Sequence, residues 1–248
     1  MNFDLTQNID RSDRISMPQN NAMLPEMTQI WLQTLKWQPT AEQQRQFQQL
    51  YELILAGNRQ LNLTRITDPI DFWEKHLWDS LRGVLFLENP SPSPSPLLKT
   101  QRCIDIGTGA GFPGMPIAIA LPHWQVTLLD STRKKITFLD TLIQQLGLSN
   151  VTTSIGRAEQ ISKQSPHQHN YDIAVIRAVG SASVCAEYAL PFLKIGGLAI
   201  LYRGNWTAEE GELLQPTIEQ LGGQVESIEA FATPLSQSVR HCLYLRKV

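Results

Sequence analysis

A glycine-rich segment with one acid is the part of the chain best suited to ligand chemistry. Residues 105–114 read DIGTGAGFPG and directly follow a short apolar run. Glycine adopts positive φ and lets a ligand lie where a Cβ would clash, so the pattern predicts a tight strand-to-helix turn against a ligand. Asp105 argues against a pyrophosphate, because like charges repel, and suits a sulfonium or an amino group. We therefore expect Asp105, Gly107, Gly109 and Gly111 to bind S-adenosylmethionine rather than a dinucleotide.

A second acid ends the next predicted strand, the apolar run 126–129. Asp130 lies 19 residues past Gly111, close to the spacing of about 20 residues for an acid that binds ribose hydroxyls. Ser131 and Thr132 would then lie beside the ribose. An N-cap role for Asp130 at a helix that begins near Arg133 is the alternative, and both roles can hold together.

The loop after the third predicted strand reads GRAE over residues 156–159. In a doubly wound sheet this loop covers the adenine pocket, so Ala158 and Glu159 are expected to line it. The Glu159 carboxylate can accept a hydrogen bond from the adenine amino group. A solvated loop acid is the alternative.

The fourth predicted strand ends in Arg177 and offers no proton acceptor. Many amino-group methyltransferases carry an acid, two prolines and an aromatic residue at this tip. An exocyclic amine must lose a proton on methylation, whereas N7 of guanine has a free lone pair. Arg177 is therefore compatible with N7 chemistry, and it can donate to guanine, to the cofactor carboxylate or to a phosphate. A salt bridge at the end of the sheet is the alternative.

The charge of the chain is nearly balanced, with 21 basic and 23 acidic residues and a formal net charge of −2. Any contact with nucleic acid must therefore come from a local basic face rather than from the overall charge. A phosphate-binding rim is the candidate for RNA binding, although short basic clusters are usually just solvated. It comprises Arg133, Lys134, Lys135, Arg203, Arg240 and His241.

Strand and helix patterns alternate after Lys99, which predicts an α/β domain with a doubly wound, mostly parallel, seven-stranded sheet. Such a sheet binds ligands at the carboxyl ends of its strands, where the residues above are expected to meet. The last two strands have no helix between them and should pair as an antiparallel hairpin at the edge. The predicted strands are 102–106, 125–129, 151–155, 171–176, 197–202, 224–231 and 241–247, and the predicted helices are 114–121, 132–146, 181–193 and 207–221.

The chain before the sheet divides by composition. A polar stretch over 1–22 is expected to lack fixed structure, and an alternating Ser-Pro run over 89–98 is expected to be an extended spacer. Helices should fill 23–88, which leaves 99–248 as the domain that binds S-adenosylmethionine. Thr40 and Gln43 form a capping-box pattern, and a further helix is predicted over 72–87 with Asp71 at its start.

The remaining reactive side chains suggest no further chemistry. Three separated cysteines lie in apolar contexts and are expected to be buried free thiols, and His167 and His169 lack the neighbours of a metal site. The first 21 residues have no apolar segment typical of a secretory signal, and no apolar run reaches transmembrane length. We expect a cytoplasmic monomer without a metal and without membrane contact.

Together these motifs resemble one family, the bacterial small-subunit rRNA methyltransferase G, also called glucose-inhibited division protein B. The resemblance covers most of residues 50–248, and the combination of motifs carries it rather than any one of them. Besides the segments above, it includes Asn62-Leu63-Thr64, His76, Asp79-Ser80, Lys135, Phe138-Leu139 and Arg240-His241.

The resemblance implies a class I, Rossmann-like methyltransferase fold with an N-terminal helical extension. It implies methyl transfer from S-adenosylmethionine to N7 of one guanine in 16S rRNA, free or within the small ribosomal subunit, and we expect Arg177 to be the catalytic residue. One departure is Arg203, where the family usually has lysine; the charge is kept but the hydrogen-bonding geometry differs. The Ser-Pro run and the polar N-terminus look like additions. The implied cofactor contacts are Gly107, Phe112, Asp130, Ser131, Thr132, Ala158, Glu159 and Arg177.

Two other hypotheses use the same residues. An NAD-linked oxidoreductase could share the sheet, but Asp105 and the spacing GxGxG, in place of GxGxxG, argue against it. A non-enzymatic RNA- or ribosome-binding protein could also keep the fold. The intact acids Asp105, Asp130 and Glu159 argue against that loss of function, because an unused cofactor pocket loses such acids freely.

Overall fold

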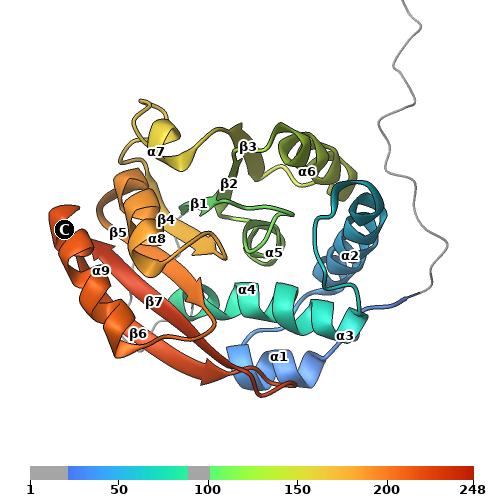
Figure 1. Ribbon diagram of the computed structural model, residues 1–248. Coiled ribbons are helices and arrows are strands. Elements are labelled where there is room, and N and C mark those ends of the chain that lie inside the picture. The colour runs from blue at the N-terminus through green and yellow to red at the C-terminus, as the bar shows by residue number, and fades with distance from the viewer. Residues whose placement is uncertain (1–21, 89–100) are drawn as a thin grey trace, which may run out of the picture.

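A mostly parallel sheet forms the centre of the structure (Figure 1). The computed structural model describes residues 22–88 and 101–248, so residues 1–21 of the predicted tail and the Ser-Pro spacer at 89–98 lie outside the described residues. Within these ranges the sheet has seven strands in the order β3-β2-β1-β4-β5-β7-β6. They are β1 (Arg102–Ile106), β2 (Gln125–Asp130), β3 (Val151–Ile155), β4 (Tyr171–Arg177), β5 (Leu193–Arg203), β6 (Gly223–Ala232) and β7 (Val239–Lys247).

The strand pairing confirms the predicted sheet. Strands β1 to β5 pair in parallel, and β7 is antiparallel to both of its neighbours, β5 and β6. The last two strands therefore form the expected antiparallel pair at the edge. All five parallel strands present their carboxyl ends at one rim of the sheet, which is where β1 runs into the glycine-rich turn and β4 ends in Arg177.

Side chains alternate along the strands, so the sheet has a hydrophobic core on each face. Ile104 and Ile106 of β1 belong to the core formed with α7, α8 and α9, whereas Cys103 belongs to the core formed with α5 and α6. Figure 1 shows α8 and α9 apart from α5, across the sheet. These helices are α5 (Gly114–Ala120), α6 (Arg133–Leu146), α7 (Ala158–Ile161), α8 (Ala182–Ala189) and α9 (Ala208–Gln220).

The N-terminal helices cover the face of the sheet that carries α5 and α6. Trp31, Phe72 and Trp78 are buried in the same hydrophobic core as α5 and the sheet. Gln43 Nε2 also donates hydrogen bonds to two carbonyl groups at the end of α5, both at 3.0 Å. The helices are α1 (Thr28–Leu35), α2 (Ala41–Leu61), and one continuous helix made of α3 (Pro69–Phe72), a π-helical turn (Trp73–Trp78) and α4 (Asp79–Arg82).

Two helix starts test the predicted caps. Thr40 and Gln43 form the predicted capping box at the start of α2. The predicted start of the next helix at Asp71 was wrong, because Asp68 caps it instead. The Asp68 Oδ1 accepts from the backbone N–H groups of Ile70 and Asp71 at 2.9 and 3.1 Å, and a proline follows at the first helical position, which favours this start.

The three cysteines, Cys103, Cys185 and Cys242, are buried free thiols, as predicted. Burial raises the pKa of the Cys103 and Cys185 thiols, so both remain protonated at neutral pH and are poor nucleophiles. Among the described helices, none combines the length and the apolar character needed to cross a membrane.

Candidate active site

The glycine-rich turn between β1 and α5 has the predicted backbone conformation. Gly107, Gly109 and Gly111 adopt φ values of +70°, +60° and +98°, which side chains rarely allow. A Cβ at Gly107 would lie 2.6 Å from the Val179 side chain, and one at Gly111 would lie 2.6 Å from Met115. A Cβ at Gly109 would have nothing closer than 3.9 Å, so this glycine leaves open space above the turn.

Asp105 stabilises the glycine-rich turn through hydrogen bonds to two of its residues. It is fully buried, and its Oδ2 accepts from the Thr108 hydroxyl at 2.6 Å and from the Gly114 backbone N–H at 2.7 Å. Its Oδ1 is buried and has no hydrogen-bond partner among the described residues. Burial raises the pKa of Asp105 to about 6, although these hydrogen bonds act in the opposite direction. The acid therefore holds both ends of the turn, with one oxygen left to accept.

Asp130, at the end of β2, joins the turn to α6. Its Oδ2 accepts from the Gly109 backbone N–H at 3.1 Å, and its Oδ1 accepts from the Thr132 backbone N–H at 2.8 Å. Lys135 Nζ lies 3.6 Å from Oδ2. The N-cap residue of α6 is Thr132, so the alternative of Asp130 as the N-cap is wrong, and the Asp130 carboxylate lies at a cavity.

Two cavities meet at Gly107, which lines both. The smaller, of about 80 Å³, brings together the residues predicted to bind adenosine. Val179 also lines it and lies directly over Gly107. Ala178, before Val179, has a φ of +57°, so the chain turns sharply after β4. The predicted residues found in this cavity are Gly107, Asp130, Ser131, Ala158 and Glu159, and Tyr188 of α8 joins them.

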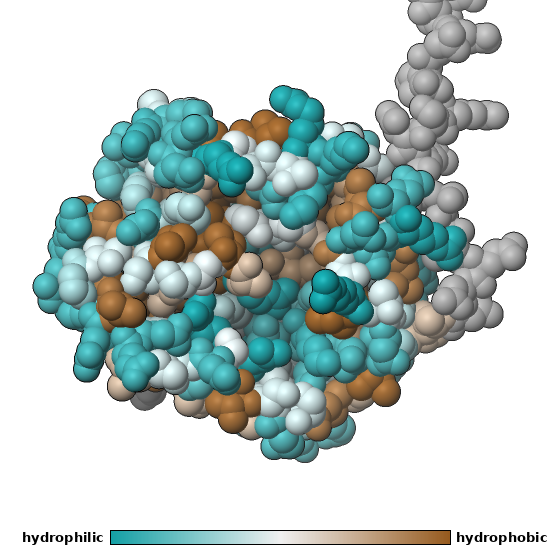
Figure 2. All heavy atoms as spheres, in the orientation of Figure 1, coloured by the Kyte–Doolittle hydropathy of each residue, from teal (hydrophilic) through white to brown (hydrophobic). Residues whose placement is uncertain are grey.

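The larger cavity, of about 760 Å³, lies between the carboxyl ends of the strands and the N-terminal helices. Figure 2 shows this face of the molecule hollowed near its centre, with hydrophilic side chains inside the hollow. The turn contributes Gly107, Thr108, Gly109, Ala110 and Phe112, and the N-terminal part contributes Leu63, Ile66, Lys75, His76 and Asp79. The cavity is thus built from both halves of the chain.

Arg177 is held at this cavity by the N-terminal helix. Its Nη1 donates to Asp79 Oδ2 at 2.9 Å and to the Lys75 carbonyl at 3.0 Å. The Arg177 and Asp79 side chains are only 15% and 11% exposed, so the pair is poorly screened by solvent. The salt-bridge alternative is therefore observed, and it lies within the site rather than outside it.

His76 lies beside Arg177 as a neutral ring. Arg177 Nη2 lies 3.4 Å from His76 Nδ1, and a guanidinium can only donate, so Nδ1 is the acceptor. His76 Nε2 then carries the hydrogen and donates to Thr64 Oγ1 at 2.9 Å. Burial, with the charges of Arg177 and Lys75, lowers the pKa of His76 to about 3. The ring also stacks on Phe112 at 4.2 Å, with the planes 8° apart.

The predicted basic rim divides between the cavity and its surroundings. Lys135, Arg203 and Arg240 line the larger cavity. Arg203 donates to Glu210 Oε1 and to the Gly180 carbonyl, both at 2.6 Å. The Nε atoms of Arg203 and Arg240 are buried without a hydrogen-bond partner among the described residues.

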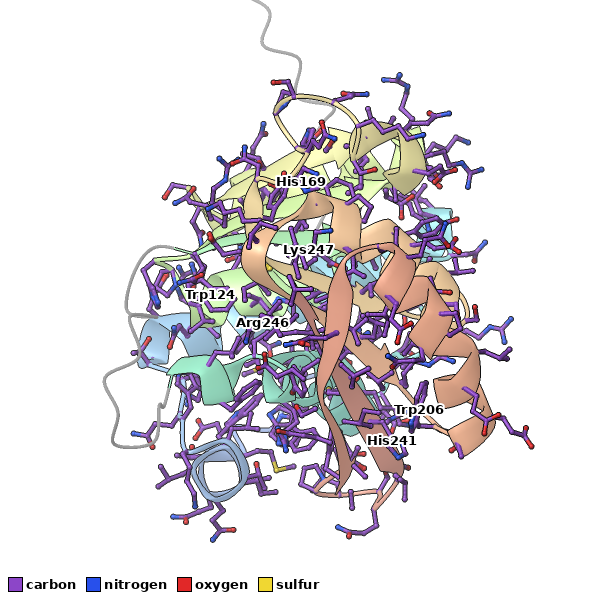
Figure 3. All side chains as sticks on the ribbon, turned by 90° about the vertical axis from the view of Figure 1, so that its left-hand side faces the viewer. Trp124, His169, Trp206, His241, Arg246 and Lys247 are labelled. Carbon is purple, nitrogen blue, oxygen red and sulfur yellow. The ribbon has the colours of Figure 1, made fainter. Side chains whose placement is uncertain are left out.

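The other three basic residues of the rim do not line either cavity. Arg133 and Lys134 are exposed at the start of α6. His241 Nδ1 lies 2.9 Å from the Gly204 carbonyl. Figure 3 shows His241 and Trp206 at one end of the β5–β7 part of the sheet, with Arg246 and Lys247 toward the other end.

Thr64, His76 and Asp79 belong to the site, although sequence reasoning from single motifs gave them no role. A weak signal was present: two polar residues, three apart, interrupt the apolar helix around Trp73 and Trp78. Buried polar groups require partners. That pattern could have indicated a polar contact, but not that its partner is Arg177.

The sequence is similar to one known family over most of its length. A family model described as rRNA small subunit methyltransferase G matches residues 43–241. The "Ribosomal RNA small subunit methyltransferase G" of Nostoc punctiforme is 64% identical over 227 residues, which cover 91% of both chains. The protein of the same name from Microcystis aeruginosa is 56% identical over 225 residues, which cover 91% of this chain and 99% of the relative.

Solved structures support the fold alone. A variant of the 16S rRNA (adenine(1408)-N(1))-methyltransferase of Catenulisporales acidiphilia, solved with cosubstrate SAM, has a TM-score of 0.51 at 18% identity, and the match covers 60% of this chain and 86% of that one. M. jannaschii TYW2, solved in complex with AdoMet, has a TM-score of 0.50 at 15% identity, covering 60% and 70%. Both matches fit the sheet topology described above.

Proposed function

The chain belongs to the rRNA small subunit methyltransferase G family, and we propose that it transfers a methyl group from S-adenosylmethionine to N7 of a guanine in 16S rRNA. The observation that carries the proposal is the family match over residues 43–241. That range contains the glycine-rich turn, Asp130 and Arg177. Both cavities are therefore lined by residues of the matched segment, and every cofactor contact expected from the sequence lies within it.

The residues around the two cavities fit S-adenosylmethionine. The smaller cavity offers the carboxylates of Asp130 and Glu159, which can accept from ribose hydroxyls and from the adenine amino group. The open space above Gly109 leaves room for a ligand against the backbone, and the buried Oδ1 of Asp105 can still accept a hydrogen bond. On the larger side Lys135 and Arg177 offer positive charge to a carboxylate. The proposed cofactor contacts are Asp105, Gly107, Gly109, Gly111, Phe112, Asp130, Ser131, Thr132, Ala158, Glu159 and Arg177.

The protein residues at the larger cavity suit a reaction that needs no general base. Bound S-adenosylmethionine supplies a methyl group already activated by its sulfonium, so the protein has to supply proximity and charge placement. Asp79 is engaged by Arg177, and the His76 Nδ1 lone pair faces the same guanidinium. Glu210, the other acid that lines this cavity, accepts a hydrogen bond from Arg203, so none of these three groups is placed to remove a proton from a substrate. This arrangement supports methylation of N7, whose lone pair is free.

The basic residues near the larger cavity are the proposed RNA contacts. Lys135, Arg203 and Arg240 line the cavity and can bind phosphates next to the guanine that enters it. Arg133, Lys134 and His241 lie outside the cavity and would contact RNA farther from that guanine. The chain is expected to act in the cytoplasm, as a monomer, on 16S rRNA or on the small ribosomal subunit.

The test is methyl transfer from labelled S-adenosylmethionine to small ribosomal subunits from cells that lack this protein, with the modified nucleotide mapped by mass. We expect the label as N7-methylguanine in 16S rRNA. Label on another atom or another RNA would contradict the proposed acceptor. Cofactor binding without any transfer would favour the RNA-binding hypothesis instead.

A further inference from the structure

We propose that Thr64, His76 and Asp79 are positioning residues for methyl transfer, which hold the Arg177 guanidinium in one orientation at the larger cavity. The inference rests on the proposed function and extends it to the N-terminal helices. These helices are then a working part of the active site rather than only a cover for one face of the sheet.

Asp79 provides the charge that fixes Arg177. Both hydrogens of Nη1 are engaged, one by Asp79 Oδ2 at 2.9 Å and one by the Lys75 carbonyl at 3.0 Å. Two acceptors from one helix therefore define the plane of the guanidinium. Contacts of Arg177 with a ligand are confined to the Nη2 and Nε side. Loss of the carboxylate would leave a largely buried cation without its counter-charge.

His76 adds a third acceptor that does not depend on pH in the physiological range. Its pKa, lowered to about 3 by burial and by Arg177 and Lys75, keeps Nδ1 unprotonated. The ring cannot turn away easily, because it stacks on Phe112 and meets the edge of Phe72 at 5.0 Å. A protonated His76 would oppose Arg177 instead of accepting from it.

Thr64 fixes the orientation of His76 from the far side. Its Oγ1 accepts from His76 Nε2 at 2.9 Å and from the Ile66 backbone N–H at 3.0 Å. The Thr64 backbone is itself held by the side chain of Asn58 through two hydrogen bonds, at 2.8 and 2.9 Å. An unbroken chain of contacts thus leads from the end of α2 to Arg177.

Fixing Arg177 in advance should favour the transition state. A free arginine side chain has considerable rotamer entropy, which the reaction would otherwise have to overcome when the charge is placed. Preorganised donors act without reorganisation at the moment of reaction. Loss of the positioning residues should therefore lower the rate of methyl transfer more than the affinity for the cofactor.

The chain offers a matched control on the same helix. Arg82 Nη2 lies 3.0 Å from Glu229 Oε2 and connects the helix to β6, and neither residue lines either of the two cavities described above. Glu229→Gln breaks an arginine–carboxylate pair between the N-terminal part and the sheet, as Asp79→Asn does. It leaves the surroundings of Arg177 unchanged.

The first experiment is a double-mutant cycle with single-turnover methyl transfer to unmodified small subunits. Asp79→Asn should slow transfer about 10- to 100-fold in the otherwise wild-type protein and cause no further loss in Arg177→Ala, because coupled residues are not additive. Calorimetry should show a smaller change in the Kd for S-adenosylmethionine than in the transfer rate, because Arg177 stays present as a proposed cofactor contact and loses only its fixed orientation. Glu229→Gln should match the wild-type rate.

Two substitutions of His76 test whether a hydrogen-bond acceptor at this position is what the reaction requires. His76→Asn keeps an acceptor near the position of Nδ1, whereas His76→Leu removes it, so transfer should be faster with asparagine than with leucine. Equal rates for the two His76 variants would overturn the proposal. So would a wild-type rate in Asp79→Asn, or a full further loss of rate when Asp79→Asn is added to Arg177→Ala. Absence of transfer by the wild-type protein would instead contradict the proposed function.

A second readout does not require catalysis. With nitrogen-15-labelled arginine, NMR should show separate, slowly exchanging Nη signals for Arg177, assigned by their loss in Arg177→Lys. Asp79→Asn should collapse these signals and Glu229→Gln should leave them. Signals that persist unchanged in Asp79→Asn would overturn the positioning role, whether or not the protein methylates RNA.

Discussion

The glycine-rich turn and the helix that begins at Pro69 serve the same cavity but are held there in different ways. In the turn, Asp105 bonds to Thr108 and Gly114, three and nine residues along the chain. On the helix, Asp79 bonds to Arg177, 98 residues away. The first set of contacts is nearly complete within one segment, whereas the second exists only once the helix has packed against the sheet.

The buried titratable groups of the two regions also differ in the direction in which burial shifts their pKa. Asp105 is buried under the turn and shapes it, with a pKa raised to about 6. His76 is buried on the helix with a pKa lowered to about 3. Burial in the turn therefore shifts Asp105 toward its protonated form, although a pKa of about 6 leaves it mainly ionised at pH 7, whereas burial on the helix keeps His76 neutral and unprotonated.

The sharpest way to separate the two regions is the pH dependence of stability, where we expect the largest effect. The stabilisation linked to protonated Asp105 is full below pH 3.8 and is lost as pH rises through about 6, a change of about 3 kcal/mol. The contribution of neutral His76 is full above pH 6.5 and is lost as pH falls toward about 3, a change at least as large. The two regions should thus oppose each other between pH 4 and 6.

Urea unfolding between pH 4 and 7 would measure this opposition. Relative to wild type, Asp105→Asn should make the free energy of unfolding rise more steeply with pH, and His76→Asn should make it rise less steeply. Wild-type protein should fall between the two. A change of the pH slope in the same direction in both variants would show that the two regions do not differ in this way.

The fold was predictable because its signals are local. Strands such as 102–106 and 151–155 are short apolar or β-branched runs bounded by turn residues, and the structure places both at the same bounds. The features that sequence reasoning missed depend on small differences between competing local signals. The start at Pro69 follows from a cap three residues earlier than the acid expected at that position, and the short helix α7 is only one turn long.

The site was predictable on the side of the turn and not on the side of the helix. Spacing placed Asp130, Ala158 and Glu159, which the structure brings into one cavity. No spacing rule links Asp79 or His76 to Arg177, because the contact depends on how an entire helix docks. Whether the predicted residues bind the cofactor and RNA stays a prediction, and the next three pairs of variants address it.

Asp130→Ala should have the largest effect on cofactor affinity among these variants. The substitution removes a charged acceptor for two hydroxyls, and hydrogen bonds to charged groups contribute about 1.5–3 kcal/mol each, so the Kd should rise at least about 100-fold. Asp140→Ala is the matched control on α6, since Asp140 accepts from the exposed Thr153 hydroxyl away from the cavities. Equal affinity of the two variants by calorimetry would remove Asp130 from the cofactor site.

Gly107→Ala and Gly147→Ala test whether the turn matters beyond its backbone conformation. Their φ values are similar, +70° and +66°, so both should lose about 1–2 kcal/mol of stability. A Cβ at Gly107 would meet Val179 at 2.6 Å, where both cavities join, whereas one at Gly147 meets nothing within 4 Å. Cofactor affinity should fall about tenfold in Gly107→Ala only, a cost of about 1.4 kcal/mol. The same loss in Gly147→Ala would attribute the effect to general destabilisation.

The smallest expected effect concerns RNA and distinguishes the cavity from its surroundings. Arg240 lines the larger cavity and Arg133 is exposed on α6, so Arg240→Gln and Arg133→Gln each remove one charge at different distances from the proposed guanine site. Each should lower the slope of log K against log salt by about 0.7–0.9, because one fewer counterion is released. Only Arg240→Gln should also slow single-turnover transfer at saturating RNA, since it disturbs the nucleotide being methylated, and neither should change cofactor affinity. Slow transfer in Arg133→Gln, with a normal rate in Arg240→Gln, would reverse the assignment and place the reacting guanine nearer to α6 than to the cavity.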